Sequence, residues 1–324
     1  MKVGFIGLGN VGAKLAGSLL RNGVDLTVRD LNPDFVAAFV ARGAKAGSSP
    51  AQMMADCDLV ITCLPSPAIC AEVVEGKDGL LNSVTAGKIW LEMSTTDADE
   101  VKRLGAMVIA KGGEAVDCPV SGGCHRADTG NISIFAGCER ATFERVLPIL
   151  TILGRRVLHT GPIGSASILK VATNYLATAN LLSCCEALVT MKAAGMDLGT
   201  TFEAFKISSG TSFVHETESQ VILNGSRDIS FTMDLVLKDI GLFHKIAEEN
   251  NIPLEISPLM IDIFKDGQKR YGARAQSDDI IRRLEDATGL DITAPGFPAE
   301  MLDDEPEEPG YEVIPASRAA TGTL

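Results

Sequence analysis

A lysine and an asparagine four positions apart stand out in the segment 168–175, which reads ILKVATNY. Lys170 is the only formally charged side chain between Arg156 and Glu186. On a helix, positions i and i+4 share one face, so the Lys170 ammonium and the Asn174 amide are expected to point the same way. Apolar neighbours favour the neutral amine and lower the pKa of a lysine toward neutrality, which suits proton transfer. The alternative is a core-helix lysine whose ammonium reaches along the helix to water.

A second chemical feature is the glycine turn GLGNVG, which contains Gly7, Gly9 and Gly12. It follows a strand-like segment at 2–7 and precedes a helix expected near 11–22. Gly7 permits a tight turn, Gly9 lets a pyrophosphate approach the backbone, and Gly12 allows close packing of helix on strand. The start of the helix then offers backbone N–H groups to phosphate. The alternative is a glycine turn in an α/β protein that binds no nucleotide.

Asp30 lies eighteen residues after Gly12, at the end of a second predicted strand over 25–30. A carboxylate at this place hydrogen-bonds the ribose hydroxyls of NAD and repels the 2′-phosphate of NADP. Arg29 keeps the other cofactor open, because a mobile guanidinium accepts that phosphate. We therefore expect NAD, with NADP as the less favoured cofactor.

The elements that must position these residues change character at Gly161-Pro162. Before this point, strand-like segments alternate with helical ones, which predicts βαβ units and a parallel sheet. These strands are expected at 2–7, 25–30, 58–65, 88–93, 114–120, 131–137 and 155–161. After this point almost only helices are expected, at 165–194, 197–208, 212–224, 231–250, 256–271 and 277–287.

The predicted fold class is thus a Rossmann-type α/β domain at 1–161 followed by an all-α domain at 162–297. The long helix at 165–194 joins the two domains. The last stretch, 298–324, is acidic and rich in proline, which is typical of a flexible tail. The alternative is a segment that contacts a neighbouring subunit.

Composition argues against several classes of partner and site. A net charge of −13 argues against nucleic acid and anionic membranes, although a small anionic ligand needs only a local site. The eight cysteines form no CxxC pair and no zinc spacing, so we expect reduced thiols and no metal site. No signal peptide precedes the glycine turn, and no uninterrupted apolar run reaches membrane-spanning length. A cytoplasmic location is expected.

Six motifs in the same order resemble the β-hydroxyacid dehydrogenase family, which contains 3-hydroxyisobutyrate dehydrogenase and tartronate semialdehyde reductase. They are GFIGLGNVG, DLVITCLP, LEMSTT, DCPVSGG, GPIGSASILKVATN and FTMDLVLKD, and they cover residues 1 to about 287. The resemblance implies a fold like that of 6-phosphogluconate dehydrogenase and a homodimer or homotetramer. It also implies NAD-dependent, reversible oxidation of a small, anionic 3-hydroxy acid to its semialdehyde.

The resemblance also implies roles for individual residues. Lys170 is expected to be the general acid/base and Asn174 to orient the substrate. The turn Ser121-Gly122-Gly123, called the nest below, is expected to hold the substrate's carboxylate, and Lys238 to lie near substrate and cofactor. The alternatives are a plain glycine turn for the nest and a solvated pair with Asp239 for Lys238. The expected cofactor contacts are Gly7, Leu8, Gly9, Asn10, Val11, Gly12, Asp30, Leu64, Pro65, Thr95, Phe231 and Lys238.

Three departures from the family pattern matter for the site. Ala166 stands where glycine is usual, and Thr173 replaces the first of two asparagines, which leaves Asn174 alone. His125 and Arg126 stand where small residues follow the nest. We expect Arg126 to extend the pocket to a second anionic or polar group of the substrate by bidentate pairing. The alternative is that both residues face solvent or pair with an acidic neighbour.

Two other functions stay open at this point. One is an NADPH-dependent reductase of a tartronate-, succinic- or glyoxylate-type semialdehyde, which works in the opposite direction. The other is of a different class, a non-catalytic dinucleotide-binding module. Some members of the family lack the lysine and serve in that way, so the presence of Lys170 with Asn174 argues against it.

Overall fold

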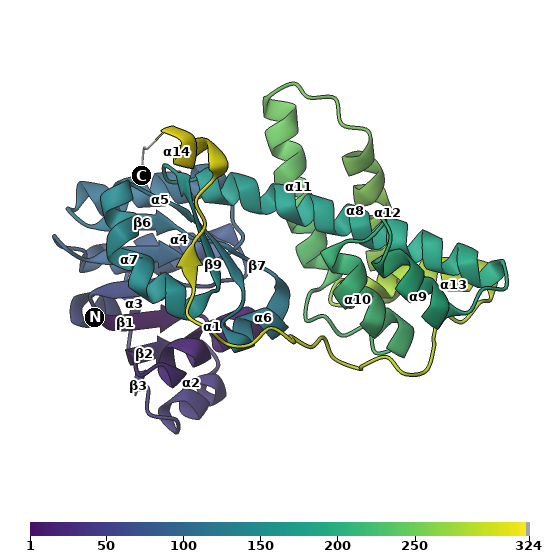
Figure 1. Ribbon diagram of the computed structural model, residues 1–324. Coiled ribbons are helices and arrows are strands. Elements are labelled where there is room, and N and C mark those ends of the chain that lie inside the picture. Colours follow the sequence, from purple (N-terminus) through teal and green to yellow (C-terminus); the bar gives the residue numbers. More distant parts are fainter. Residues whose placement is uncertain (322–324) are drawn as a thin grey trace. The chain divides into compact units, whose positions relative to one another are not determined.

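A computed structural model describes the backbone of residues 1–321 and the side chains of residues 1–318. The chain divides into two compact units (Figure 1). The first unit joins Met1–Lys170 to the segment that begins at Glu305, and the second unit is Val171–Asp304. The chain therefore passes from one unit to the other twice, once within the long helix and once after Asp304.

The first unit is built on a ten-stranded sheet in the order β10-β9-β8-β6-β5-β4-β1-β2-β3, with β7 paired to β8. Its strands are β1 (Lys2–Ile6), β2 (Asp25–Arg29), β3 (Lys45–Ala46), β4 (Leu59–Thr62), β5 (Ile89–Glu92), β6 (Glu114–Asp117), β7 (Val120–Ser121), β8 (Ser133–Gly137), β9 (Arg156–Gly161) and β10 (Tyr311–Glu312). The order β3-β2-β1-β4-β5-β6, all parallel, is that of a dinucleotide-binding sheet. The predicted Rossmann-type fold is confirmed. The sheet is mixed, however, because β8 pairs antiparallel with β6 and β7.

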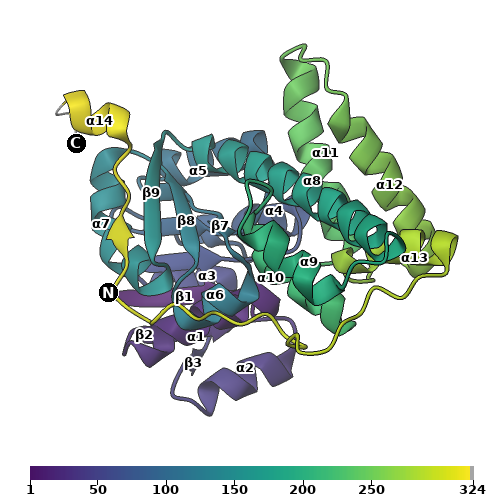
Figure 2. The same cartoon turned by 45° about the vertical axis from the view of Figure 1, so that its right-hand side comes forward.

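Helices cover both faces of this sheet, as Figures 1 and 2 show. They are α1 (Asn10–Arg21), α2 (Pro33–Val40), α3 (Pro50–Asp56), α4 (Pro67–Glu75), α5 (Ala98–Ala110), α6 (Gly123–Thr129) and α7 (Arg140–Leu153), with the 3-10 turn η1 (Leu80–Asn82). Two separate clusters of buried side chains result, one around Phe5, Leu15 and Phe143 and the other around Trp90 and Leu104. Burial on both faces explains why the central strands are continuously apolar rather than alternating.

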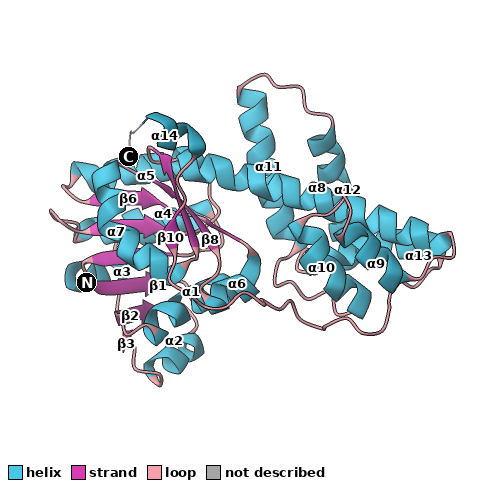
Figure 3. Cartoon of the chain, in the orientation of Figure 1, coloured by secondary structure: helices cyan, strands magenta, loops and turns pink. Residues whose placement is uncertain are grey.

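The second unit contains helices and no strands among the residues that the structure describes (Figure 3). Its elements are α9 (Leu198–Lys206), α10 (Phe213–Asn224), α11 (Met233–Glu249), α12 (Ile256–Tyr271), η2 (Ser277–Ile281) and α13 (Arg282–Thr288). The long helix α8 (Ser165–Ala193) starts in the first unit and continues into the second. A core of its own, which includes Leu188, Ile222 and Phe264, holds the second unit together. The all-α prediction is confirmed.

The helix α8 carries the longest stretch of the chain without a charged side chain, from 171 to 185. Within residues 1–321, no helix has both the length and the hydropathy that crossing a bilayer requires. Polar residues interrupt this stretch, and several of its side chains, such as Leu181 and Cys185, lie in the core of the second unit.

The C-terminal segment, defined as residues 305–318, differs from the flexible tail that its composition predicts. Its strand β10 pairs in parallel with β9 at the edge of the sheet, and α14 (Ala316–Thr321) follows (Figure 2). Carboxylates of the segment pair with arginines of the same unit; the pairs are Glu305 with Arg126 and Arg156, Glu308 with Arg155, and Glu312 with Arg140. The acidic residues that predicted a solvated tail are therefore held by cations distant in the sequence.

Removing the C-terminal segment tests this packing. A chain that ends at Asp304 loses β10 and leaves the edge of β9 open, and its arginines lose their carboxylates. We expect the Tm to fall by several degrees, since each partly exposed ion pair contributes about 0.2–1 kcal/mol. We also expect self-association, because an open strand edge pairs with other chains. Thermal denaturation and light scattering measure both effects.

The control is a chain that ends after Glu312, which keeps β10 and its ion pairs. Equal melting temperature and equal dispersity of the full chain and the chain ending at Asp304 would show that the segment does not stabilise the sheet.

Candidate functional site

The glycine turn connects β1 to α1 and is held against the neighbouring strands. Gly7 has φ 100° and donates its N–H to the Arg29 carbonyl at 2.9 Å. A Cβ at Gly7 would overlap the carbonyl oxygen of Cys63, and a Cβ at Gly12 would overlap that of Gly7. A Cβ at Gly9 would meet nothing within 4 Å. Packing thus requires Gly7 and Gly12, whereas the exposed Gly9 borders open space at the start of α1, where a phosphate fits.

Asp30 lies directly after β2 and is fastened to this turn. Its Oδ2 accepts the Leu8 N–H at 2.6 Å, and its Oδ1 accepts the Asn32 N–H at 2.8 Å. The carboxylate therefore stands beside the glycine turn, where a ribose is expected. The guanidinium of Arg29 donates to the Ser48 carbonyl at 2.7 Å, so it is directed toward the loop after β3.

The predicted cofactor contacts Leu64, Pro65 and Thr95 follow the carboxyl ends of β4 and β5, which are neighbours in the sheet. The Leu64 N–H donates to Ser94 Oγ at 2.7 Å, next to Thr95. Ser94 in turn donates its N–H to the carboxyl group of Glu92 at 2.7 Å. Glu92 is fully buried, and this burial raises its pKa against the effect of its hydrogen bonds. It ties together the loops that carry Leu64-Pro65 and Thr95.

The nest lies between β7 and α6. Gly122 and Gly123 have φ angles of 130° and 86°, a region that glycine adopts without strain. Gly123 is the first residue of α6, a helix that the sequence did not predict. A Cβ at Gly122 would lie 3.3 Å from Cδ of Arg126, so the Arg126 side chain runs past the nest.

Arg126 also pairs with an acidic neighbour. Its Nη2 lies 2.9 Å from Oε1 of Glu305, in the C-terminal segment. The structure thus shows the alternative that the sequence left open for this residue. A contact between Arg126 and substrate stays a prediction.

Lys170 lies near the start of α8 and is only 7% exposed. The first turn of this helix is anchored by Asp117, which ends β6 and is fully buried. The Asp117 carboxylate accepts the Ser167 N–H at 2.8 Å and the Ser167 hydroxyl at 2.7 Å. Burial raises the pKa of Asp117 to about 6, while the bonds from Ser167 oppose the rise. Since Ser167 and Lys170 are three positions apart, the anchored face of the helix also carries the lysine.

Asn174, Lys238 and Asp239 form a cluster within the second unit. Asn174 Nδ2 donates to Asp239 Oδ2 at 2.5 Å, and Lys238 Nζ lies 3.2 Å from Asp239 Oδ1. Asp239 is 2% exposed, so this is not a solvated pair on a helix surface. Asp239 joins α11 to α8, and Phe231, just before α11, donates its N–H to Gln276 Oε1 at 3.2 Å.

The predicted site residues therefore fall into two groups, one in each unit. The first unit holds the glycine turn, Asp30, Leu64, Pro65, Thr95, the nest, Arg126 and Lys170. The second unit holds Asn174, Phe231 and Lys238. Sequence reasoning missed the supporting acids Glu92, Asp117 and Glu305. For Glu92 and Asp117 a signal exists, because each is a carboxylate at the end of an otherwise apolar strand.

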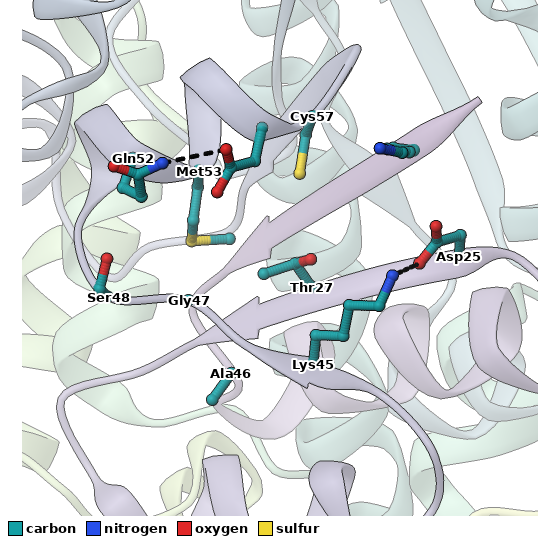
Figure 4. Close-up of a pocket in the computed structure, with 11 residues that line it drawn as sticks. Asp25, Thr27, Lys45, Ala46, Gly47, Ser48, Gln52, Met53 and Cys57 are labelled. Carbon is teal, nitrogen blue, oxygen red and sulfur yellow. Dashed lines mark hydrogen bonds and ion pairs between the residues drawn. The ribbon is translucent and has the colours of Figure 1, made fainter.

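A separate hollow of about 210 Å³ lies beside β2 and β3 (Figure 4). Its polar lining is internally paired: Lys45 Nζ lies 2.6 Å from Asp25 Oδ1, and Gln52 donates to Asp56 at 2.9 Å. No predicted site residue lines it. It is not the candidate site.

All eight cysteines are free thiols. Burial raises the pKa of the Cys138 thiol to about 12, which favours the protonated form. Within the part of the chain that the structure describes, no three or more His, Cys, Asp or Glu side chains are grouped to hold a metal ion.

Known proteins resemble this chain over nearly all of its length. Residues 2–161 match the family model described as the NAD binding domain of 6-phosphogluconate dehydrogenase. Residues 164–284 match the model described as NAD-binding of NADP-dependent 3-hydroxyisobutyrate dehydrogenase. Together, these two stretches contain every predicted site residue and stop short of the C-terminal segment.

Individual relatives agree with the family models. The chain is 33% identical over 294 residues to 2-(hydroxymethyl)glutarate dehydrogenase of Eubacterium barkeri, over 90% of this chain and 98% of that protein. It is 30% identical over 270 residues to mitochondrial 3-hydroxyisobutyrate dehydrogenase of Mus musculus, over 81% of each chain. The crystal structure of 3-hydroxyisobutyrate dehydrogenase from Salmonella typhimurium matches with a TM-score of 0.79 and 25% identity, over 88% of this chain and 99% of that one.

These matches extend through both units and include the glycine turn, the nest and the lysine helix. They support a hydroxyacid dehydrogenase activity of the 3-hydroxyisobutyrate dehydrogenase and glyoxylate reductase type. The chain is an NAD(P)-dependent oxidoreductase that belongs to the β-hydroxyacid dehydrogenase family.

Proposed function

We propose that the chain oxidises a small 3-hydroxy acid to its semialdehyde with NAD, reversibly, and that Lys170 is the proton acceptor and donor. The observation that carries this proposal is the buried amine of Lys170, on a helix whose first turn is anchored to the dinucleotide-binding sheet by Asp117. Low exposure favours the neutral amine, which is the form of a lysine that accepts a proton.

The residues of the glycine turn fit a dinucleotide. Backbone N–H groups at the start of α1 would hold the pyrophosphate over Gly9, where no side chain intervenes. Asp30 would bind the adenosine ribose, and Arg29 is directed at the Ser48 carbonyl instead of a 2′-phosphate. This arrangement supports NAD over NADP. When bound, the nicotinamide accepts or supplies the hydride.

The remaining residues would bind and orient the substrate. The nest would hold its carboxylate through the Ser121 hydroxyl and backbone N–H groups. The substrate's hydroxyl proton would pass to Lys170 Nζ as the carbinol hydrogen leaves with its electron pair, and the reverse reaction would return the proton to the carbonyl oxygen. Asn174, held by Asp239, would orient the hydroxyl, and Lys238 would supply a cation near the substrate.

The second candidate is an NADPH-dependent reductase of a small semialdehyde. It uses the same residues and differs in direction and coenzyme. A homodimer or homotetramer and a cytoplasmic location stay predictions.

A coenzyme and substrate screen tests the function directly. We expect 3-hydroxy acids to reduce NAD with a kcat/KM about tenfold or more above that for NADP, equivalent to about 1.4 kcal/mol of discrimination. The rise in absorbance of NADH or NADPH measures the rate with each coenzyme. Turnover with NADPH and a semialdehyde, without NAD reduction, would favour the second candidate. No turnover of either coenzyme with any hydroxy acid or semialdehyde would refute both.

The lysine is tested by Lys170→Met. We expect kcat to fall about 10²- to 10⁴-fold, because proton transfer by a positioned group contributes that much. The dissociation constant of NADH, measured by fluorescence titration, should stay unchanged. The control Lys192→Met removes one charge from the other end of α8 and should keep kcat. A folded Lys170→Met protein with near-normal turnover would rule out the proton role.

The glycine turn is tested by a matched pair of alanine substitutions. Gly9→Ala places its methyl group in open space, so we expect unchanged Tm and a cofactor dissociation constant raised about tenfold or more. Gly12→Ala forces a clash with the Gly7 carbonyl, so we expect a loss of about 1–3 kcal/mol of stability. Thermal melts measure the loss of stability, and NADH titration measures the loss of cofactor binding. If Gly9→Ala bound NADH as tightly as the unaltered chain, the phosphate would not lie over Gly9.

A further inference from the structure

The C-terminal segment brings a carboxylate to Arg126, in the helix that begins at the nest, from outside the family-matched stretches 2–161 and 164–284. Glu305 is fixed through its main chain as well as its side chain. Its carbonyl accepts a hydrogen bond from Nδ2 of Asn131 at 2.9 Å, and Asn131 is fully buried. Its carboxylate is placed 2.9 Å from Arg126 and 3.3 Å from Arg156.

Arg126 is the residue that the sequence predicts to meet a second anionic or polar group of the substrate. It lies in α6, which begins at the nest, and its Cδ approaches the Cβ position of Gly122 within 3.3 Å. Its side chain is 20% exposed, so its charge is partly shielded from water. The guanidinium already pairs with a carboxylate of the same chain, that of Glu305.

We propose that Glu305 is a specificity-determining residue, which holds Arg126 and so favours 3-hydroxy acids with an uncharged 2-substituent over those with a second carboxylate. This inference rests on the proposed function. A dicarboxylic substrate has to displace Glu305 from Arg126 or share the guanidinium with it. Displacement breaks the ion pair between Glu305 and Arg126, and sharing places two anions close together, so both arrangements disfavour binding.

Two acids make a matched pair of substrates for the test. 3-Hydroxyisobutyrate and 2-(hydroxymethyl)glutarate share a 3-hydroxypropanoate core, and they differ in a methyl against a carboxyethyl group at carbon 2. The measured quantity is the ratio of kcat/KM for the dicarboxylate to kcat/KM for the monocarboxylate. A ratio cancels changes in active-enzyme concentration and in the chemical step that the two acids share.

We expect the ratio to be below one for the unaltered chain and to rise about tenfold in Glu305→Gln, which removes the charge and keeps the shape. The control Glu308→Gln removes the same charge from the same segment, but Glu308 pairs with Arg155 and not with Arg126. Its ratio should stay within twofold of the unaltered chain. In the double variant Glu305→Gln with Arg126→Gln, the gain should disappear. If Glu305→Gln does not fold, Glu305→Ser removes the same charge and should give the same rise.

Several results would overturn the inference. One is an unaltered enzyme that prefers the dicarboxylate, and another is an unchanged ratio in Glu305→Gln. Equal gains in Glu305→Gln and Glu308→Gln would show a general charge effect, and a gain that survives loss of Arg126 would point to Arg156 instead. If the unaltered chain oxidises 3-hydroxyisobutyrate but these ratios do not move, only the specificity role fails. If it oxidises neither acid with NAD or NADP, the proposed function fails with it.

Discussion

The candidate site depends on the two hydrogen bonds that Ser167, in the first turn of α8, donates to the Asp117 carboxylate. A buried carboxylate is costly unless donors satisfy it, and the first N–H groups of a helix have no partners within the helix. Ser167 supplies its N–H and its hydroxyl to Asp117, so each group satisfies the other. Lys170 lies three residues after Ser167 in the same helix, so this attachment to the end of β6 positions the lysine within the first unit.

The parts of the fold that sequence predicts well are those whose chemistry is local. The glycine turn and Asp30 indicate the nucleotide-binding half by their residue types and spacing. The helices of the second unit are predicted from the helical segments that glycine and Asn-Gly breaks separate. The short helix α6 was missed because it begins with Gly123 and has no capping side chain. The helix α2 was missed although Asn32 before Pro33 is a recognisable cap and start.

The position of Glu92 and Asp117 at the ends of apolar strands is visible in the sequence, but the roles of the supporting acids are not, because these roles depend on partners brought in by the fold. Glu92 and Asp117 lie at the ends of adjacent strands, β5 and β6, and both are fully buried. Glu92 connects the loops that follow β4 and β5 through Ser94, and Asp117 anchors the first turn of α8. Glu305 belongs to a segment whose composition alone predicts disorder. Its role depends on Arg126 in α6 and Arg156 in β9, and no local sequence pattern connects these arginines to Glu305.

The place of β10 in the chain has a consequence for biosynthesis. The sheet of the first unit receives its last strand from residues that follow all of the second unit. On the ribosome, β1 to β9 emerge first, and the edge of β9 stays uncovered while α9 to α13 are being translated. An uncovered edge is a point of attachment for chaperones or for another nascent chain. The first unit is therefore translated first, and its sheet receives its last strand only after the second unit has been translated.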